Sequence, residues 1–208
     1  MESEQITICD ENGKPLGVAA RREIHQKGYW HQTFHCWFVS RKDGKEWVHL
    51  QMRSSAKRDF PNLFDITAAG HLLKGERVED GMREVEEELG IPLRFEDLVP
   101  LGVIKDQMRL GEFIDNELCQ AFLYRMPDHD VKYEFQKDEV AGMVMMEFQD
   151  FYDLCMERKK KVQAAGFEVQ ADGLRKDVKR MVSLSDLVPH GKGYLEKVAV
   201  LIHEQLGA

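Results

Sequence analysis

Residues 83–90 read REVEEELG, and this stretch decides how the fold and the function of the chain are interpreted. Glu86, Glu87 and Glu88 stand in a row, and Glu84 lies two positions before them. The loop that precedes them is acidic as well. A segment with this much negative charge needs a physical reason, because neighbouring carboxylates on a helix repel one another.

Apolar residues recur in this region with the period of a helix. They are spaced by four, three and four positions and comprise Val78, Met82, Val85 and Leu89. This pattern predicts a helix from about residue 78 to residue 89 with one apolar face toward the core. Gly90 follows directly and is a natural end for such a helix.

The helical geometry also gathers the acids. Residues three and four apart share a face, so Glu84, Glu87 and Glu88 are expected to point the same way. Glu86 is expected to face solvent. Arg83 is the only cation in the predicted helix, too few to offset the acids. A solvated helix face is the simplest interpretation, but a divalent cation such as Mg²⁺, which prefers carboxylate oxygens, would remove the repulsion and make the face a site.

The longer stretch GHLLKGERVEDGMREVEEELGI, residues 70–91, resembles the signature box of Nudix hydrolases. That box runs Gly, five residues, Glu, seven residues, Arg-Glu, an aliphatic residue, any residue, Glu-Glu, any residue, Gly and an aliphatic residue. The chain departs from it once, because six residues rather than seven separate Glu76 from Arg83. The shortening leaves REVEEELGI intact and puts the role of Glu76 in question.

The resemblance implies an α/β (α+β) fold, an α/β/α sandwich around a mixed β-sheet, in which the box forms a loop, a helix and a loop. It implies Mg²⁺-dependent hydrolysis, with Mn²⁺ as a possible substitute, of a diphosphate bond in a nucleoside diphosphate linked to another moiety or in a related small organic diphosphate. The implied metal-site residues are Gly70, Glu84, Glu87 and Glu88. Arg83 is implied to orient a glutamate by ion pairing. The general base stays open among Glu87, Glu88 and Glu139.

The flanking sequence resembles the Nudix subgroup related to isopentenyl-diphosphate isomerase. In that isomerase a second metal site uses three histidines and two acids, and the matching positions here are His25, His31, His71, Asp115 and Glu117. Arg53 and Lys57 match residues that grip the diphosphate of the substrate.

An isomerase is therefore one alternative function, but its catalytic cysteine lies just before the box, where this chain has Ala68 or Ala69. Neither side chain can transfer a proton. Cys36 and Cys119 lie inside expected strands and are predicted to be core residues. A module that binds nucleotides or diphosphates without turnover is a second alternative, suggested by the shortened loop.

The rest of the chain reads as strands followed by helices. We expect a hairpin across residues 5–24, strands at 31–40, 46–53, 99–110, 116–126 and 139–148, and helices at 148–166 and 193–206. The ERKKKVQ run at 157–163 is predicted to be a solvated helix face. Residues 1–150 would form the Nudix hydrolase domain, and residues 151–208 a helical C-terminal extension packed on the same domain.

Composition excludes several classes of protein. With 43% hydrophobic and 32% charged residues in 208, the chain has the composition of a soluble globular protein. A net charge of −8 disfavours a nucleic-acid groove. An acidic N-terminus and the lack of a long apolar run predict a cytoplasmic protein without a signal peptide or membrane partner. Four scattered cysteines without CxxC spacing disfavour a zinc ribbon or a disulfide framework. A homodimer is possible by analogy with related enzymes.

Overall fold

The computed structural model describes residues 3–127, 131–170 and 172–207. Its strands are β1 Gln5–Cys9, β2 Pro15–Ala20, β3 Trp30–Lys42, β4 Lys45–Arg53, β5 Phe64–Asp65, β6 Ala68–His71, β7 Leu98–Leu110, β8 Phe113–Arg125, β9 Val140–Glu147, β10 Val162–Val169 and β11 Arg175–Val182. Its helices are α1 Arg21–Lys27, α2 Arg83–Leu89, α3 Phe148–Cys155 and α4 Tyr194–Leu206, with 3-10 turns η1 Val78–Met82, η2 Phe95–Asp97 and η3 Leu184–Asp186.

The described strands join into one mixed sheet, as predicted. The longest path through it runs β11-β10-β9-β4-β3-β1-β2, and β8 branches from β3 to meet β7. Strands β3 and β8 pair in parallel, whereas β3 and β4 form an antiparallel hairpin. Asp43 and Gly44 close that hairpin with positive φ angles of 54° and 75°, the conformation that a tight two-residue hairpin turn requires.

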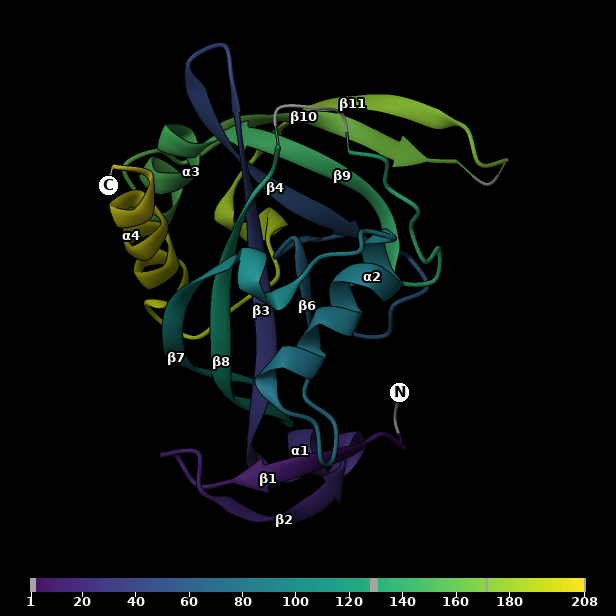
Figure 1. The fold of residues 1–208 in the computed structure, drawn as a ribbon, viewed down its shortest axis with the longest axis vertical. Coiled ribbons are helices and arrows are strands. Elements are labelled where there is room, and N and C mark those ends of the chain that lie inside the picture. Colours follow the sequence, from purple (N-terminus) through teal and green to yellow (C-terminus); the bar gives the residue numbers. More distant parts are fainter. Residues whose placement is uncertain (1–2, 128–130, 171, 208) are drawn as a thin grey trace.

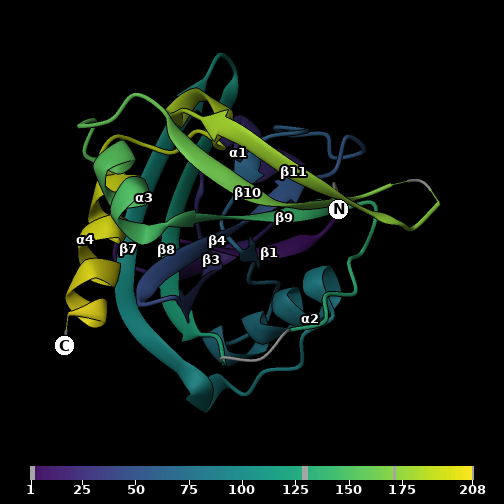
Figure 2. The same ribbon diagram turned by 90° about the horizontal axis from the view of Figure 1, so that it is seen from above.

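The alternation of side chains along β3 builds two cores. Trp37 and Val39 belong to a cluster shared with α3 and α4, whereas Phe34 and Phe38 point to the opposite face and pack with Val85 and Leu89 of α2. Figures 1 and 2 accordingly show α3 and α4 on one side of the central strands and α2 on the other. The layers α, β and α follow from this pattern.

The helix predicted over residues 78–89 is present in two parts. The first turn is the 3-10 helix η1, and the α-helix α2 begins only at Arg83. Gly90 ends it with a φ angle of 69°, as predicted. Val85 and Leu89 are fully buried, so the predicted apolar face is confirmed.

Two sequence predictions of secondary structure are wrong. The strand expected to reach residue 24 ends at Ala20, because Arg21 begins α1. The helix expected over 148–166 ends at Cys155, since Glu157 takes a left-handed φ of 55° and turns the chain. The lysines of the ERKKKVQ run therefore lie in an exposed loop and not on a helix.

Residues 151–208, expected to be helical, contribute two strands as well as helices. Strand β10 pairs with β9 and with β11, which extends the central sheet. Helix α4 lies where the sequence predicts it, and Val198 and Ile202 are fully buried against the sheet core. In the described parts of the chain, the helices are all too short or too polar to cross a membrane.

Candidate active site

A cavity of about 260 Å³ lies where the ends of several elements meet, and every residue predicted for the site except His31 lines it. Strand β4 contributes Arg53, β6 contributes Gly70 and His71, α2 contributes its acids, and β8 contributes Asp115 and Glu117. The residues come from segments far apart in sequence, so the fold brings the predicted positions together.

The acids of α2 differ in exposure. Glu88 is only 3% exposed, whereas the Glu87 side chain is 56% exposed and reaches the mouth of the cavity. The carboxylate of Glu84 lies directly against the backbone of Gly70, where a Cβ atom would overlap it. Figure 1 shows the closeness of α2 and β6 that this contact requires. Because Gly70 has no side chain, the Glu84 carboxylate can lie against the backbone of β6.

Arg83 holds these acids together. Its Nε atom donates to Oε1 of Glu76 at 2.8 Å, and its Nη1 atom lies 2.6 Å from Glu84 and 3.4 Å from Glu87. Nη2 donates to the backbone oxygen of His71 at 2.8 Å. The other oxygen of Glu76 accepts the Leu73 N–H at 2.7 Å. The shortened loop therefore still delivers Glu76 to Arg83.

Burial controls the charge of the two enclosed glutamates. Burial, together with the negative charge of Glu88, raises the pKa of Glu84 to about 8 although Arg83 opposes the shift. Burial raises the pKa of Glu88 to about 7 against the opposing charge of Lys57. Both carboxyl groups therefore gain from a nearby cation, which stabilises the ionised form.

Lys57 lies between Glu88 and Glu139. Its Nζ atom contacts the Glu139 carboxylate and lies 3.6 Å from Oε1 of Glu88. Gln51, which sequence reasoning missed, donates to Oε2 of Glu88 at 3.1 Å. Gln51 and Arg53 are two positions apart on β4 and therefore share one face of the strand. Since Arg53 was predicted for the site, this spacing could have indicated Gln51 as well.

Arg53 lines the cavity with its guanidinium already held. Nη1 donates to Oδ2 of Asp65 at 2.6 Å, and Nη2 and Nε donate to the backbone oxygens of Asp59 and Phe60 at 2.8 and 3.1 Å. These bonds fix the direction of the guanidinium in the wall of the cavity.

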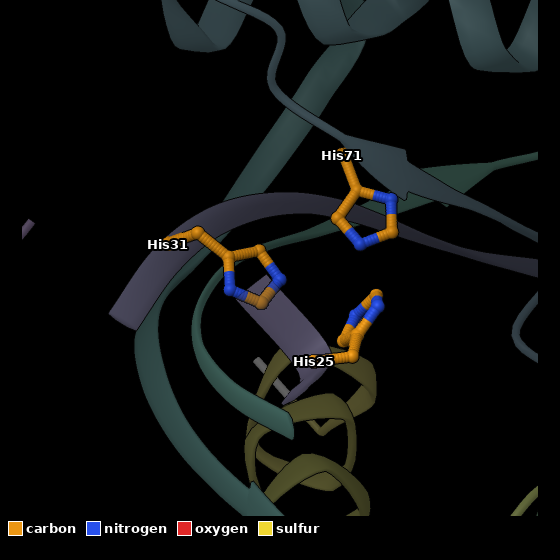
Figure 3. Close-up of side chains that lie close together, drawn as sticks. All are labelled: His25, His31 and His71. Atoms are coloured by element: carbon orange, nitrogen blue, oxygen red, sulfur yellow. The ribbon is translucent and has the colours of Figure 1, made fainter. Parts of the chain in front are cut away.

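The three predicted histidines form a cluster, of which His25 and His71 line the cavity. His25 comes from α1, His31 from β3 and His71 from β6, and their rings gather around a common space (Figure 3). One nitrogen of each lies within 4.8 Å of the others. Oδ1 of Asp115 lies 3.4 Å from Nε2 of His25 and 3.6 Å from Nε2 of His31.

Glu117 completes this set, with Oε1 3.8 Å from Nε2 of His31. Nδ1 of His31 lies 3.1 Å from the backbone oxygen of Tyr29, which assigns the ring proton to Nδ1 and directs the lone pair of Nε2 into the cluster. Burial, with the nearby charge of Arg21, keeps the pKa of His71 well below its ordinary value and so favours the neutral, metal-binding form.

Three atoms of the cluster are buried without a hydrogen-bond partner among the described residues: His31 Nε2, His71 Nε2 and Asp115 Oδ1. Buried polar atoms are rarely left unpaired, because each one forfeits its bond to water. A divalent ion that takes imidazole nitrogen and carboxylate oxygen would satisfy all three. The donor set therefore fits a metal ion.

Sequence reasoning missed a second ring of polar residues behind the cluster. His35 lies on the same face of β3 as His31, and its Nε2 atom is 3.5 Å from Glu117. Its Nδ1 atom is 2.5 Å from the hydroxyl of Tyr194 on α4. His190 lies 2.6 Å from Asp106 of β7 and also lines the cavity. The spacing of four between His31 and His35 places both on one face of a strand and could have indicated His35. No such pattern in the sequence indicates His190 or Tyr194.

The described lining residues of the cavity include no cysteine. Ala69 lines it, and Ala68 pairs with Cys36 on β3, whose thiol is fully buried. Burial raises the pKa of Cys36 and of Cys119, so neither is an activated thiol. The prediction that both are core residues is confirmed.

Comparison with known proteins agrees with this geometry. The family model of the NUDIX domain matches residues 29–167. A protein of Clostridium acetobutylicum, named as an uncharacterized Nudix hydrolase, is 39% identical over 198 residues, which cover 95% of this chain and 96% of that protein. An isopentenyl-diphosphate Delta-isomerase of Mycolicibacterium vanbaalenii is 28% identical over 149 residues, covering 71% of this chain and 79% of that protein.

A crystal structure of a protein from Deinococcus radiodurans has a similar fold. The TM-score is 0.55 at 17% sequence identity, and the match covers 74% of this chain and 90% of that one. At this identity the similarity concerns the fold alone.

Proposed function

Because the chain belongs to the Nudix family of hydrolases, we propose that it uses divalent metal ions, Mg²⁺ or in its place Mn²⁺, to hydrolyse a diphosphate bond in a small molecule. The observation that carries this proposal is one cavity that joins the acids of α2 to the cluster of three histidines and two acids. Basic residues Arg53 and Lys57 line the same cavity, as binding of a diphosphate requires.

The acids of α2 would hold one ion. Glu88 is buried and Glu84 is partly buried, the charge of Glu88 acts on Glu84, and the Glu84 carboxylate lies against the backbone of Gly70. Bound ions of this kind polarise phosphoryl oxygens and lower the pKa of a bound water. Arg83 positions Glu84 and Glu87, and Glu76 in turn fixes Arg83.

The general base is assigned to Glu87. Glu88 is bonded to Gln51 and lies near Lys57, and Glu139 is bonded to Lys57. Glu87 has only the longer contact with Arg83 and is the most exposed of the three, so its carboxylate is the most free to accept a proton from water.

Isomerisation is the less favoured function. It would need a proton donor at Ala68 or Ala69, and the buried thiols of Cys36 and Cys119 do not replace one. The histidine cluster and the isomerase relatives do not decide between the two functions, since a diphosphate substrate serves both.

The proposal is tested by incubating the protein with Mg²⁺ or Mn²⁺ and a panel of nucleotide sugars, dinucleotides, nucleoside triphosphates and isoprenoid diphosphates. We expect one class to release a phosphate-containing product and EDTA to stop the release. Glu87→Gln should lower the rate, whereas Glu86→Gln should not, because Glu86 lies on the same helix but is exposed, and its side chain has no bonding partner among the described residues. Tight binding without a product would favour the non-catalytic module instead.

A further inference from the structure

The C-terminal segment brings a histidine into the cavity that neither the signature box nor the metal clusters contain. His190 lies in the loop before α4, and the adjoining Val188 and Pro189 line the cavity with it. Its side chain is 11% exposed, so it is enclosed but not sealed off. The inference drawn from this position rests on the proposed diphosphate substrate.

Two neighbours fix the imidazole. Oδ2 of Asp106 lies 2.6 Å from Nδ1 of His190, and Oδ1 of Asp106 accepts the N–H of Gly191 at 2.6 Å. A Cβ atom at Gly191 would overlap the backbone oxygen of Gln107, so glycine allows this close approach. The ring of Tyr194 stacks on the imidazole with centroids 4.2 Å apart.

These contacts use Nδ1 and one face of the ring. Among the described residues Nε2 of His190 has no hydrogen-bond partner. It is not among the atoms that are both fully buried and unpaired, so it is not sealed off. Because His190 lines the cavity and its Nδ1 atom is occupied, Nε2 is the ring nitrogen that is left for a ligand.

Three carboxylates act on His190, those of Asp106, Asp65 and Glu117, and none of them forms a hydrogen bond with Nε2 in the part of the chain that the structure describes. Both oxygens of Asp106 are occupied, and Asp65 is bonded to Arg53 and to the N–H of Ile66. Although burial opposes it, the bond to Asp106 raises the pKa of His190. The charged form, which carries a proton on Nε2 as well, is thereby favoured.

We propose that His190 is a substrate-binding residue, held by Asp106 and Tyr194 so that its Nε2–H donates a hydrogen bond to a phosphoryl oxygen of the bound diphosphate. It would act beside Arg53 and Lys57, which reach the cavity from β4 and the loop that follows. The C-terminal segment would thus take part in substrate recognition in addition to covering the sheet.

Two replacements separate this role from a structural one. In His190→Asn the side-chain amide nitrogen can replace Nδ1 and keep the bond to Asp106, but nothing reaches the position of Nε2. In His190→Gln the amide nitrogen can replace Nε2. We would measure kcat and KM on the substrate found in the panel, binding of inorganic pyrophosphate with Mg²⁺ by calorimetry, and the melting temperature of each variant.

We expect His190→Asn to have the same melting temperature as the wild type. It should bind pyrophosphate about tenfold or more weakly, with a matching rise in KM, because a hydrogen bond to a charged group is lost. His190→Gln should recover part of that affinity. The inference would be overturned if His190→Asn kept the pyrophosphate affinity and the KM of the wild type. It would also be overturned if both variants lost affinity in step with a fall in melting temperature.

The pyrophosphate arm keeps the two proposals distinguishable. A wild type that binds pyrophosphate but cleaves no compound contradicts hydrolysis, and the variants still test His190. If the wild type and His190→Asn cleave a diphosphate equally well, the role of His190 is contradicted, and hydrolysis is not. A wild type that neither binds nor cleaves diphosphates overturns both.

Discussion

Nε of Arg83 lies 2.8 Å from Oε1 of Glu76, across the loop that is one residue shorter than the family pattern. The shortening therefore does not separate the two residues. We predict that Glu76→Gln lowers kcat by about tenfold with little change in KM, because a weaker bond to Arg83 loosens Glu84 and Glu87 in the site. Steady-state kinetics with Glu86→Gln as the matched control checks this, and an unchanged kcat in Glu76→Gln would contradict it.

Stability without metal should fall as the pH rises. The pKa values of Glu84 and Glu88, about 8 and about 7, lie above the ordinary value of 4.5, so the folded state binds more protons than the unfolded state between pH 4.5 and 8. The contribution of these two groups to the stability of the metal-free protein is therefore fully present below pH 4.5. It is lost as the pH rises to about 8.

The melting temperature in EDTA across this range measures the effect. Glu88→Gln should flatten the dependence, and Mg²⁺ should raise the melting temperature more at pH 8 than at pH 5, since it binds the ionised carboxylates. A stabilisation by Mg²⁺ that does not change with pH would count against ligation by these two acids.

The histidine cluster should bind a transition-metal ion on its own. We predict that His71→Gln removes one equivalent of bound Mn²⁺ or Co²⁺, because a third of the imidazole donors is lost from a buried set. Calorimetry counts the sites. His203→Gln is the control, since His203 is exposed on α4. The same stoichiometry in both variants would show that the cluster holds no metal ion.

Gly70 should not tolerate a side chain. We predict that Gly70→Ala displaces the Glu84 carboxylate and lowers kcat/KM by about tenfold or more, because the new Cβ overlaps it. Gly17→Ala is the control, since a Cβ there meets only Ile8 at 3.8 Å in another strand. Equal activity in both variants would contradict the assigned role of Gly70.

Local pattern carried much of this site. The period of α2 predicted Val85 and Leu89 in the core and Glu84, Glu87 and Glu88 on one shared face. Val85 and Leu89 are fully buried, and the three acids all line the cavity. The resemblance to known enzymes supplied the histidines and Asp115, which no local pattern unites.

What the sequence could not predict depends on long-range pairing. His190 meets Asp106 across 84 positions, and Tyr194 meets His35 across 159. Such contacts follow from the path of the chain around the sheet and leave no periodic signal. The helix wrongly predicted through residue 166 fails for a related reason, because pairing with β9 and β11 overrides the local helix propensity.

The measurement that tests the central claim most directly is ³¹P NMR of the reaction carried out in ¹⁸O-labelled water with Mg²⁺. We predict new phosphorus signals shifted by one ¹⁸O atom on a product phosphate, formed at a rate that falls sharply in Glu87→Gln and not in Glu86→Gln. Conversion of substrate without label on phosphorus, or equal rates in both variants, would contradict hydrolysis at the acids of α2.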